Sequence, residues 1–122
     1  MPSIAIIGAS NNREKYGNKA VRAYLHKGYT VYPVNPKEEM IEGLKVYKSV
    51  LDIPGSVDIA SFYVLPQIGI KIIEEVAQKG IKEAYFNPGS ESDELYEKAK
   101  QLGINPIIAC SITAVGLSPN QL

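Results

Sequence analysis

A run of apolar residues near the N-terminus that breaks at a glycine constrains the fold more than any other feature. The run Ile4-Ala5-Ile6-Ile7 leads into Gly8-Ala9-Ser10, and a polar stretch over residues 11–15 precedes an apolar-periodic segment. A short apolar run bounded by turn residues is typical of a strand covered on both faces. The pattern predicts a buried strand that turns sharply and re-enters as a helix, the first part of a βαβ unit.

The stretch from Gly8 to Gly17 has the composition of a loop that binds phosphate. Gly8 permits a tight turn, and free N–H groups at the start of the next helix favour an anion. Ser10 and Arg13 can both donate hydrogen bonds to a phosphate. These two residues stand where the dinucleotide fingerprint G-x-G-x-x-G has its second and third glycines. We predict a phosphate-binding loop, and a glycine turn of purely structural use is the alternative.

The end of the second predicted strand is equally informative. A strand over 29–34 ends in Tyr32-Pro33-Val34-Asn35-Pro36-Lys37, without the acidic residue that binds the ribose of NAD. The prolines predict a rigid wall suited to an adenine or ribose, and Lys37 offers a charge for a phosphate on that ribose. This pattern excludes NAD and leaves the 3′-phosphate of coenzyme A (CoA) or the 2′-phosphate of NADP. A proline-rich turn with a solvated lysine is the alternative.

The remaining pattern alternates strands with helices. Strands are predicted over 3–7, 29–34, 57–64, 81–86 and 104–109, and helices over 16–27, 67–79 and 92–102. The second of these helices is predicted to bury Ile68, Ile72, Ile73 and Val76. Residues 45–47 look strand-like, and residues 111–122 form a loop or short helix. The chain is therefore predicted to be α/β, a Rossmann-like three-layer sandwich with a five-stranded parallel sheet and residues 1–122 as one domain.

Composition narrows the function classes. Lys plus Arg and Asp plus Glu number 13 each, so the chain carries no net charge, which argues against a nucleic-acid binder or a polybasic membrane anchor. No apolar run is long enough for a bilayer, and we expect a cytoplasmic protein. With one cysteine, Cys110, and one histidine, His26, we expect neither an internal disulfide nor a metal site. No catalytic constellation is visible from spacing.

Four stretches together resemble the CoA-binding domain family. They are Ile6–Ser10, Val31–Lys37, Val57-Asp58 and Asn87-Pro88-Gly89. The family includes small stand-alone proteins and the N-terminal domain of the succinyl-CoA synthetase α subunit. The resemblance implies a Rossmann-like sheet with strand order 3-2-1-4-5, counted along the chain. The synthetases carry their phosphorylatable histidine and second substrate domain beyond this module, so the resemblance implies binding rather than ligase activity.

The family's binding mode implies a site at the carboxyl edge of the sheet. The CoA diphosphate is expected on Gly8, Ala9, Ser10 and Arg13, in the loop that Gly17 closes. The adenosine and its 3′-phosphate are expected at Val34, Asn35, Pro36 and Lys37, flanked by Val64, Leu65 and Pro66. Asn87 and Gly89 follow the fourth strand at the same edge. The implied role is binding of CoA or an acyl-CoA by a non-catalytic carrier, sensor or subunit.

Two further hypotheses remain open at this point. An NADP-binding Rossmann domain of an oxidoreductase is the alternative function, because Lys37 also suits a 2′-phosphate. Cys110 follows the last predicted strand, so the pantetheine arm could bring the CoA thiol to it and form a mixed disulfide; a buried core cysteine is the simpler interpretation. A homo-oligomer or an unknown protein partner is compatible with the sequence.

Overall fold

The computed structural model of the protein describes residues 2–122 and contains a parallel five-stranded sheet. Its strands are β1 (Ser3–Ile7), β2 (Thr30–Val34), β5 (Ile59–Phe62), β6 (Glu83–Phe86) and β7 (Asn105–Ile108). The helices are α1 (Tyr16–His26), α2 (Pro66–Lys79), α3 (Asp93–Gln101) and α4 (Ser111–Ala114). Two 3₁₀ turns, η1 (Val50–Asp52) and η2 (Pro119–Gln121), and a hairpin of β3 (Met40–Ile41) with β4 (Leu44–Lys45) complete the elements. The predicted α/β class and Rossmann-like parallel sheet are confirmed.

The predicted strand order 3-2-1-4-5, in which the five predicted strands are numbered along the chain, is wrong. The sheet runs β2-β1-β5-β6-β7, so the strand predicted over 57–64 pairs with β1 and does not lie beyond β2. The outer edge of β2 is already taken, because Tyr47 forms an isolated parallel bridge with Val34 and its N–H donates to the Pro33 carbonyl. The strand-like stretch at 45–47 therefore fills the place that the prediction gave to the third strand.

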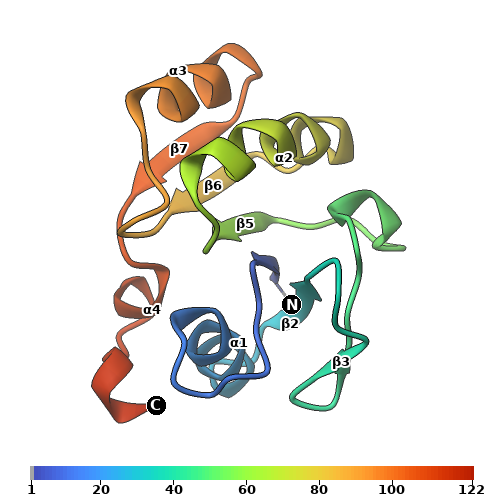
Figure 1. Cartoon of the computed structure of the whole chain (residues 1–122), viewed down its shortest axis with the longest axis vertical. Helices are drawn as coiled ribbons and strands as arrows, with labels where there is room; N and C mark the ends of the chain where they lie inside the picture. The colour runs from blue at the N-terminus through green and yellow to red at the C-terminus, as the bar shows by residue number, and fades with distance from the viewer. Residues whose placement is uncertain (1) are drawn as a thin grey trace.

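Helices cover both faces of the sheet. In Figure 1, α2 and α3 lie on one side of the strands, and α1 and α4 lie on the other. Strand β1 is buried along its whole length and alternates between the two layers. Ala5 and Ile7 belong to the core cluster beneath α2, whereas Ile4 and Ile6 belong to the cluster beneath α1. This two-sided burial explains why the β1 sequence is apolar throughout.

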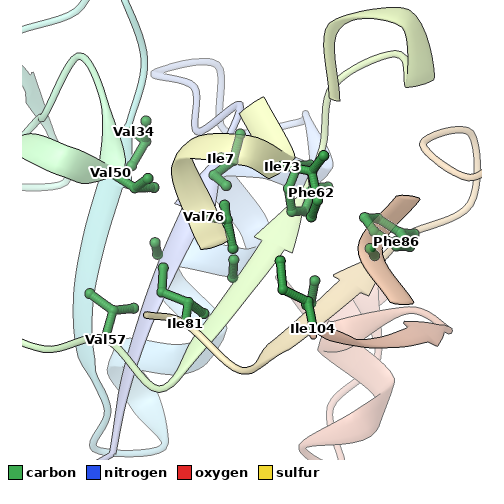
Figure 2. Close-up of a cluster of buried hydrophobic side chains, with 14 of the residues drawn as sticks. Ile7, Val34, Val50, Val57, Phe62, Ile73, Val76, Ile81, Phe86 and Ile104 are labelled. Carbon is green, nitrogen blue, oxygen red and sulfur yellow. The ribbon is translucent and has the colours of Figure 1, made fainter. Parts of the chain in front are cut away.

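The larger core cluster lies between the sheet and α2. Figure 2 shows the side chains of Ile73 and Val76 on α2 gathered with Ile7, Phe62 and Phe86 from the strands. The rings of Phe62 and Phe86 meet edge to face, with their centroids 5.1 Å apart. This packing fixes the first turn of α2 beside the carboxyl ends of β1 and β5.

Local signals set the ends of the helices. Pro66 is the first residue of α2, where its missing N–H costs no helical hydrogen bond, and Gly80 ends the helix with a φ of 86°. The Ser92 hydroxyl caps α3 by accepting from the Leu95 N–H at 3.1 Å.

Over residues 2–122, no helix combines the length and apolar character that crossing a bilayer requires.

Candidate functional site

A cleft of about 440 Å³ opens where β1, β5 and β6 end at their carboxyl edge. We call it the loop cleft, because the β1–α1 connection (residues 8–15) forms one wall. Its lining residues are Gly8, Ala9, Ser10, Lys15, Tyr16, Gly17, Asn35, Tyr63, Val64, Leu65, Pro88, Gly89 and Ser90. The cleft therefore brings together predicted residues from four separate turns, as expected for ligand sites in open parallel sheets.

Two glycines allow the β1–α1 connection to pack as it does. Gly8 has a φ of 90°, and a Cβ at this position would lie 2.7 Å from the Tyr63 carbonyl oxygen. At Gly17 a Cβ would lie 2.3 Å from the Gly8 carbonyl oxygen. The start of α1 thus touches the turn directly, which is the close helix–strand packing that the third glycine provides in the dinucleotide fingerprint.

The backbone of the connection presents donors rather than acceptors to the cleft. The Ala9 carbonyl accepts from Asn35 Nδ2 and the Ser10 carbonyl accepts from the buried Asn18 Nδ2, each at 2.8 Å. Among the described residues, the N–H groups of Ala9 and Ser10 have no acceptor. The N–H groups of Tyr16 and Gly17, the first two residues of α1, likewise have no acceptor among the described residues, whereas the Asn18 N–H donates to the Lys15 carbonyl. These donors and the helix dipole favour an anion at this point.

Arg13 lies outside the loop cleft. Its guanidinium Nε is 3.8 Å from Glu42 Oε2 on the β3–β4 hairpin, and its side chain is 65% exposed. Its carbonyl accepts from Arg22 Nη2. Lys15 provides the positive charge in the lining instead. The spacing of the motif could not distinguish the two, since both lie in the same polar stretch.

A second cleft, of about 480 Å³, adjoins the first along β2. We call it the β2 cleft, and it shares Gly8, Asn35 and Val64 with the loop cleft. Its lining residues are Ile7, Gly8, Val34, Asn35, Pro36, Lys37, Lys48, Ser49, Val64, Ile68, Ile72 and Glu75. The predicted residues of the second turn, Val34 to Lys37, all line it. The Asn35 side chain holds this turn, because its Oδ1 accepts from the N–H groups of Lys37 and Glu38.

One helix prediction is corrected at this cleft. Ile68 was expected to be buried, but it is 47% exposed, because α2 begins beyond the end of β5 and its first turn borders the β2 cleft. Ile72 is half-buried at the same wall. Pro66, one of the expected site residues, lines neither cleft and instead starts the helix.

A third cavity, of about 280 Å³, adjoins the loop cleft at lining residues other than those that the β2 cleft shares. This Cys110 pocket is lined by Tyr16, Tyr63, Asn87, Pro88, Cys110, Thr113 and Pro119. Tyr16, Tyr63 and Pro88 also line the loop cleft, so the two cavities adjoin. Cys110 follows β7, which is three places from β1 rather than two as predicted. Tyr16 and Tyr63 nonetheless line both the loop cleft and the Cys110 pocket.

A buried polar network supports the Cys110 pocket. The Ser111 hydroxyl lies 2.8 Å from the Ser61 hydroxyl and 2.9 Å from the Tyr63 hydroxyl. Tyr24 donates from its hydroxyl to the Ser111 carbonyl at 2.7 Å. Burial raises the pKa of Tyr63 to about 12, and the hydrogen bond to Ser111 opposes this shift. Tyr63 therefore stays protonated near neutral pH and can donate a hydrogen bond.

Asn87 belongs to this network. It is 1% exposed, and its Nδ2 donates to the Ser61 hydroxyl and to the Phe62 carbonyl. Its Oδ1 accepts from the Ser111 N–H at 2.8 Å. Both amide hydrogens are thus used within the protein, so Asn87 positions the Cys110 pocket.

The described residues hold no cluster of three or more His, Cys, Asp or Glu side chains able to bind a metal ion.

Sequence reasoning missed several lining residues, chiefly Lys15, Tyr16, Tyr63, Pro88, Lys48 and Glu75. Tyr63 and Pro88 carried a usable signal, because Tyr63 lies at the carboxyl end of the strand predicted over 57–64 and Pro88 lies in the turn after the strand predicted over 81–86. Lys48 and Glu75 carried none, since their place in the lining depends on how the η1 segment and α2 pack together.

The chain is similar in sequence to proteins of a known family. The family model described as "CoA binding domain" matches residues 2–116. An α subunit of ADP-forming acetate–CoA ligase I of Pyrococcus furiosus is 35% identical over 98% of this chain and 29% of its own length. The corresponding subunit of ligase II from that organism is 42% identical over 65% of this chain and 18% of its own length. The chain thus spans less than a third of these ligase subunits.

A solved structure agrees over the whole fold. A conserved hypothetical protein of Pyrococcus furiosus superposes with a TM-score of 0.86 at 37% identity, covering 93% of this chain and 99% of that protein. The family model matches nearly the whole chain, which confirms the resemblance seen in the β1 and β2 turns. The chain belongs to the CoA-binding domain family.

Proposed function

We propose that the protein binds CoA, or an acyl-CoA, across the three adjoining cavities at the carboxyl edge of the sheet. The observation that carries this proposal is their order: the β2 cleft, the loop cleft and the Cys110 pocket follow one another with shared lining residues. CoA is an elongated ligand with a nucleotide at one end, a diphosphate in the middle and a thiol at the other end. The cavities match that order of chemistry.

The middle of the ligand, the diphosphate, is proposed to lie against the β1–α1 connection. The free N–H groups of Ala9 and Ser10, the start of α1 and the Lys15 ammonium all favour negative charge there. Gly8 and Gly17 allow the β1–α1 connection and the start of α1 to pack closely against each other and so form this wall of the cleft. Arg13 can join the site only after leaving Glu42.

The nucleotide end is proposed to lie in the β2 cleft. Val34, Pro36 and Val64 offer apolar walls, and Lys37 and Lys48 offer two positive charges for a ribose phosphate. A lysine binds phosphate as a point charge, so two lysines can share this role. This arrangement supports CoA over its dephosphorylated form, and it also keeps NADP as a ligand to be tested.

The thiol end is proposed to reach the Cys110 pocket. Cys110 is half-buried there. We propose that it forms a mixed disulfide when oxidised CoA, the disulfide dimer, is the reactant. The Cys110 thiolate, after losing its proton to solvent, attacks one sulfur of the dimer; the S–S bond of the dimer breaks as the new one forms. One CoA leaves as the thiolate and the other stays bound.

The role that fits these features is a carrier, a sensor or a subunit of a larger enzyme, without catalysis by this chain. Its histidine, His26, ends α1, whereas Tyr16 begins that helix in the loop cleft. Ten helical steps separate them by roughly 15 Å. The residues that line the cavities serve binding and positioning.

Isothermal titration with CoA, dephospho-CoA and NADP⁺ tests the proposal. We expect CoA to bind at least tenfold more tightly than the other two, and a Lys37→Ala/Lys48→Ala variant to remove most of the difference between CoA and dephospho-CoA. Lys100→Ala, at an exposed position of α3, is the matched control. Equal binding of CoA and dephospho-CoA contradicts the 3′-phosphate assignment. Preferential binding of NADP⁺ favours the oxidoreductase alternative.

A further inference from the structure

A stripe of side chains on α2 forms one wall of the β2 cleft. Ile68, Ile72 and Glu75 are spaced four and three residues apart, so they share one face of the helix. The apolar residues Val34 and Pro36 line the same cleft from the β2 turn. The cleft is therefore a slot with apolar walls, suited to a flat ring, and a carboxylate lies at the end of the stripe.

The carboxylate at that end is held in place by a serine. Ser49 donates from its hydroxyl to Glu75 Oε1 at 2.6 Å. The Ser49 oxygen also accepts from the Leu51 N–H at 3.1 Å as it caps η1. Both hydrogen-bonding roles of Ser49 are thus used, whereas Glu75 Oε2 has no partner among the described residues. The slot offers a ligand one oriented acceptor.

We propose that Glu75 is a specificity-determining residue that recognises the exocyclic amino group of adenine. This inference rests on the proposed binding of CoA with its nucleotide in the β2 cleft. The ring lies between the α2 stripe and the β2 turn, and the amino group donates a hydrogen bond to Glu75 Oε2. Ser49 keeps the carboxylate aimed into the slot.

The same geometry rejects a base that carries an oxygen at this ring position. A carboxylate only accepts hydrogen bonds, and a 6-oxo group is also an acceptor, so the two would repel each other in a partly desolvated cleft. A site built for one hydrogen-bonding pattern discriminates more strongly than an apolar pocket does. Glu75 therefore selects the adenine form of the ligand against the hypoxanthine form.

The test compares CoA with desamino-CoA, in which hypoxanthine replaces adenine, by isothermal titration. Unmodified protein is expected to bind CoA at least tenfold more tightly than desamino-CoA. Glu75→Gln is expected to bring the ratio close to one, because a carboxamide can rotate to accept from an amino group or donate to an oxo group. Ser49→Ala is expected to lower the ratio partly, since the carboxylate is then free to turn away.

Glu74→Gln is the matched control. It removes the same charge from the neighbouring position on α2, where Glu74 is exposed and lies 3.5 Å from Lys98 Nζ. This variant should keep the ratio of the unmodified protein. Equal binding of both ligands by unmodified protein overturns the inference and leaves CoA binding intact. An unchanged ratio in Glu75→Gln overturns it as well, whereas failure to bind CoA at all overturns the proposed function itself.

Discussion

The side-chain amide of Asn35 donates a hydrogen bond of 2.8 Å to the carbonyl oxygen of Ala9. This bond joins the turn after β2 to the turn after β1, two segments that lie side by side because β1 and β2 pair in parallel. It also directs the Ala9 carbonyl toward the protein. The neighbouring N–H groups are thereby left for a ligand.

The first prediction follows from that bond. Asn35→Asp keeps an oxygen that can accept from the N–H groups of Lys37 and Glu38, but it cannot donate to Ala9. We expect CoA affinity to fall about tenfold or more, because the loss of one hydrogen bond and a carboxylate facing a carbonyl cost roughly 1–3 kcal/mol. Titration with CoA measures the change. Asn120→Asp, exposed near the C-terminus, is the control, and affinity equal to that of the unmodified protein would rule out the coupling role of Asn35.

The second prediction concerns the contact between α1 and the β1 turn. Gly17→Ala places a Cβ against the Gly8 carbonyl oxygen, so the helix must shift. We expect the free energy of unfolding to fall by about 1–3 kcal/mol and CoA binding to weaken. Urea denaturation followed by circular dichroism measures the first effect. In Gly55→Ala the nearest atom to the new Cβ, the Tyr32 hydroxyl oxygen, is 3.7 Å away, and this variant should match the unmodified protein.

The third prediction is a pH dependence. Burial raises the pKa of Tyr63 to about 12 in the folded protein, and it raises the pKa of Tyr24 as well. A tyrosine in the unfolded chain loses its proton near pH 10. The stabilisation that the two buried, protonated tyrosines give the folded protein is therefore complete below pH 10 and is lost as the pH rises toward 12. Each tyrosine lowers the free energy of unfolding by about 1.4 kcal/mol per pH unit over that range.

Tyr63→Phe tests the assignment. Urea denaturation between pH 8 and pH 11.5 should give a shallower decline for this variant, because one titrating group is gone. At pH 8 the variant should lose about 1 kcal/mol through the missing hydrogen bond to Ser111. Tyr16→Phe changes a tyrosine that is 57% exposed and should keep the original slope. Equal slopes for Tyr63→Phe and the unmodified protein would show that Tyr63 does not contribute.

The fourth prediction concerns Cys110. Protein incubated with CoA disulfide should gain the mass of one CoA moiety under denaturing, non-reducing conditions, and reductant should remove it. Cys110→Ser should show no such adduct and should still bind CoA without a covalent bond. If Cys110 resists alkylation in the native, ligand-free protein, the thiol is inaccessible and the disulfide proposal fails.

Much of the fold was predictable because its signals are local. The apolar run before Gly8, the glycine at position 80 and the Ser92 cap mark where a strand or helix begins or ends, and neighbouring residues supply the physical cause. The Val31–Lys37 motif likewise indicated the family, since its prolines and lysine bring their chemistry to one turn. The five strands of the sheet, the three long helices, the fold class and the family could therefore be predicted from the sequence alone, whereas the β3–β4 hairpin could not.

Tertiary structure decided the rest. Strand order was decided by which edges remain free: Tyr47 occupies the outer edge of β2, so β5 pairs with β1. Arg13 lies outside the expected phosphate site, where its guanidinium is next to a carboxylate on the β3–β4 hairpin. Glu75 lines the β2 cleft because α2 packs beside η1. Such contacts join residues far apart in the chain, and their partners are set by packing, which no local pattern records.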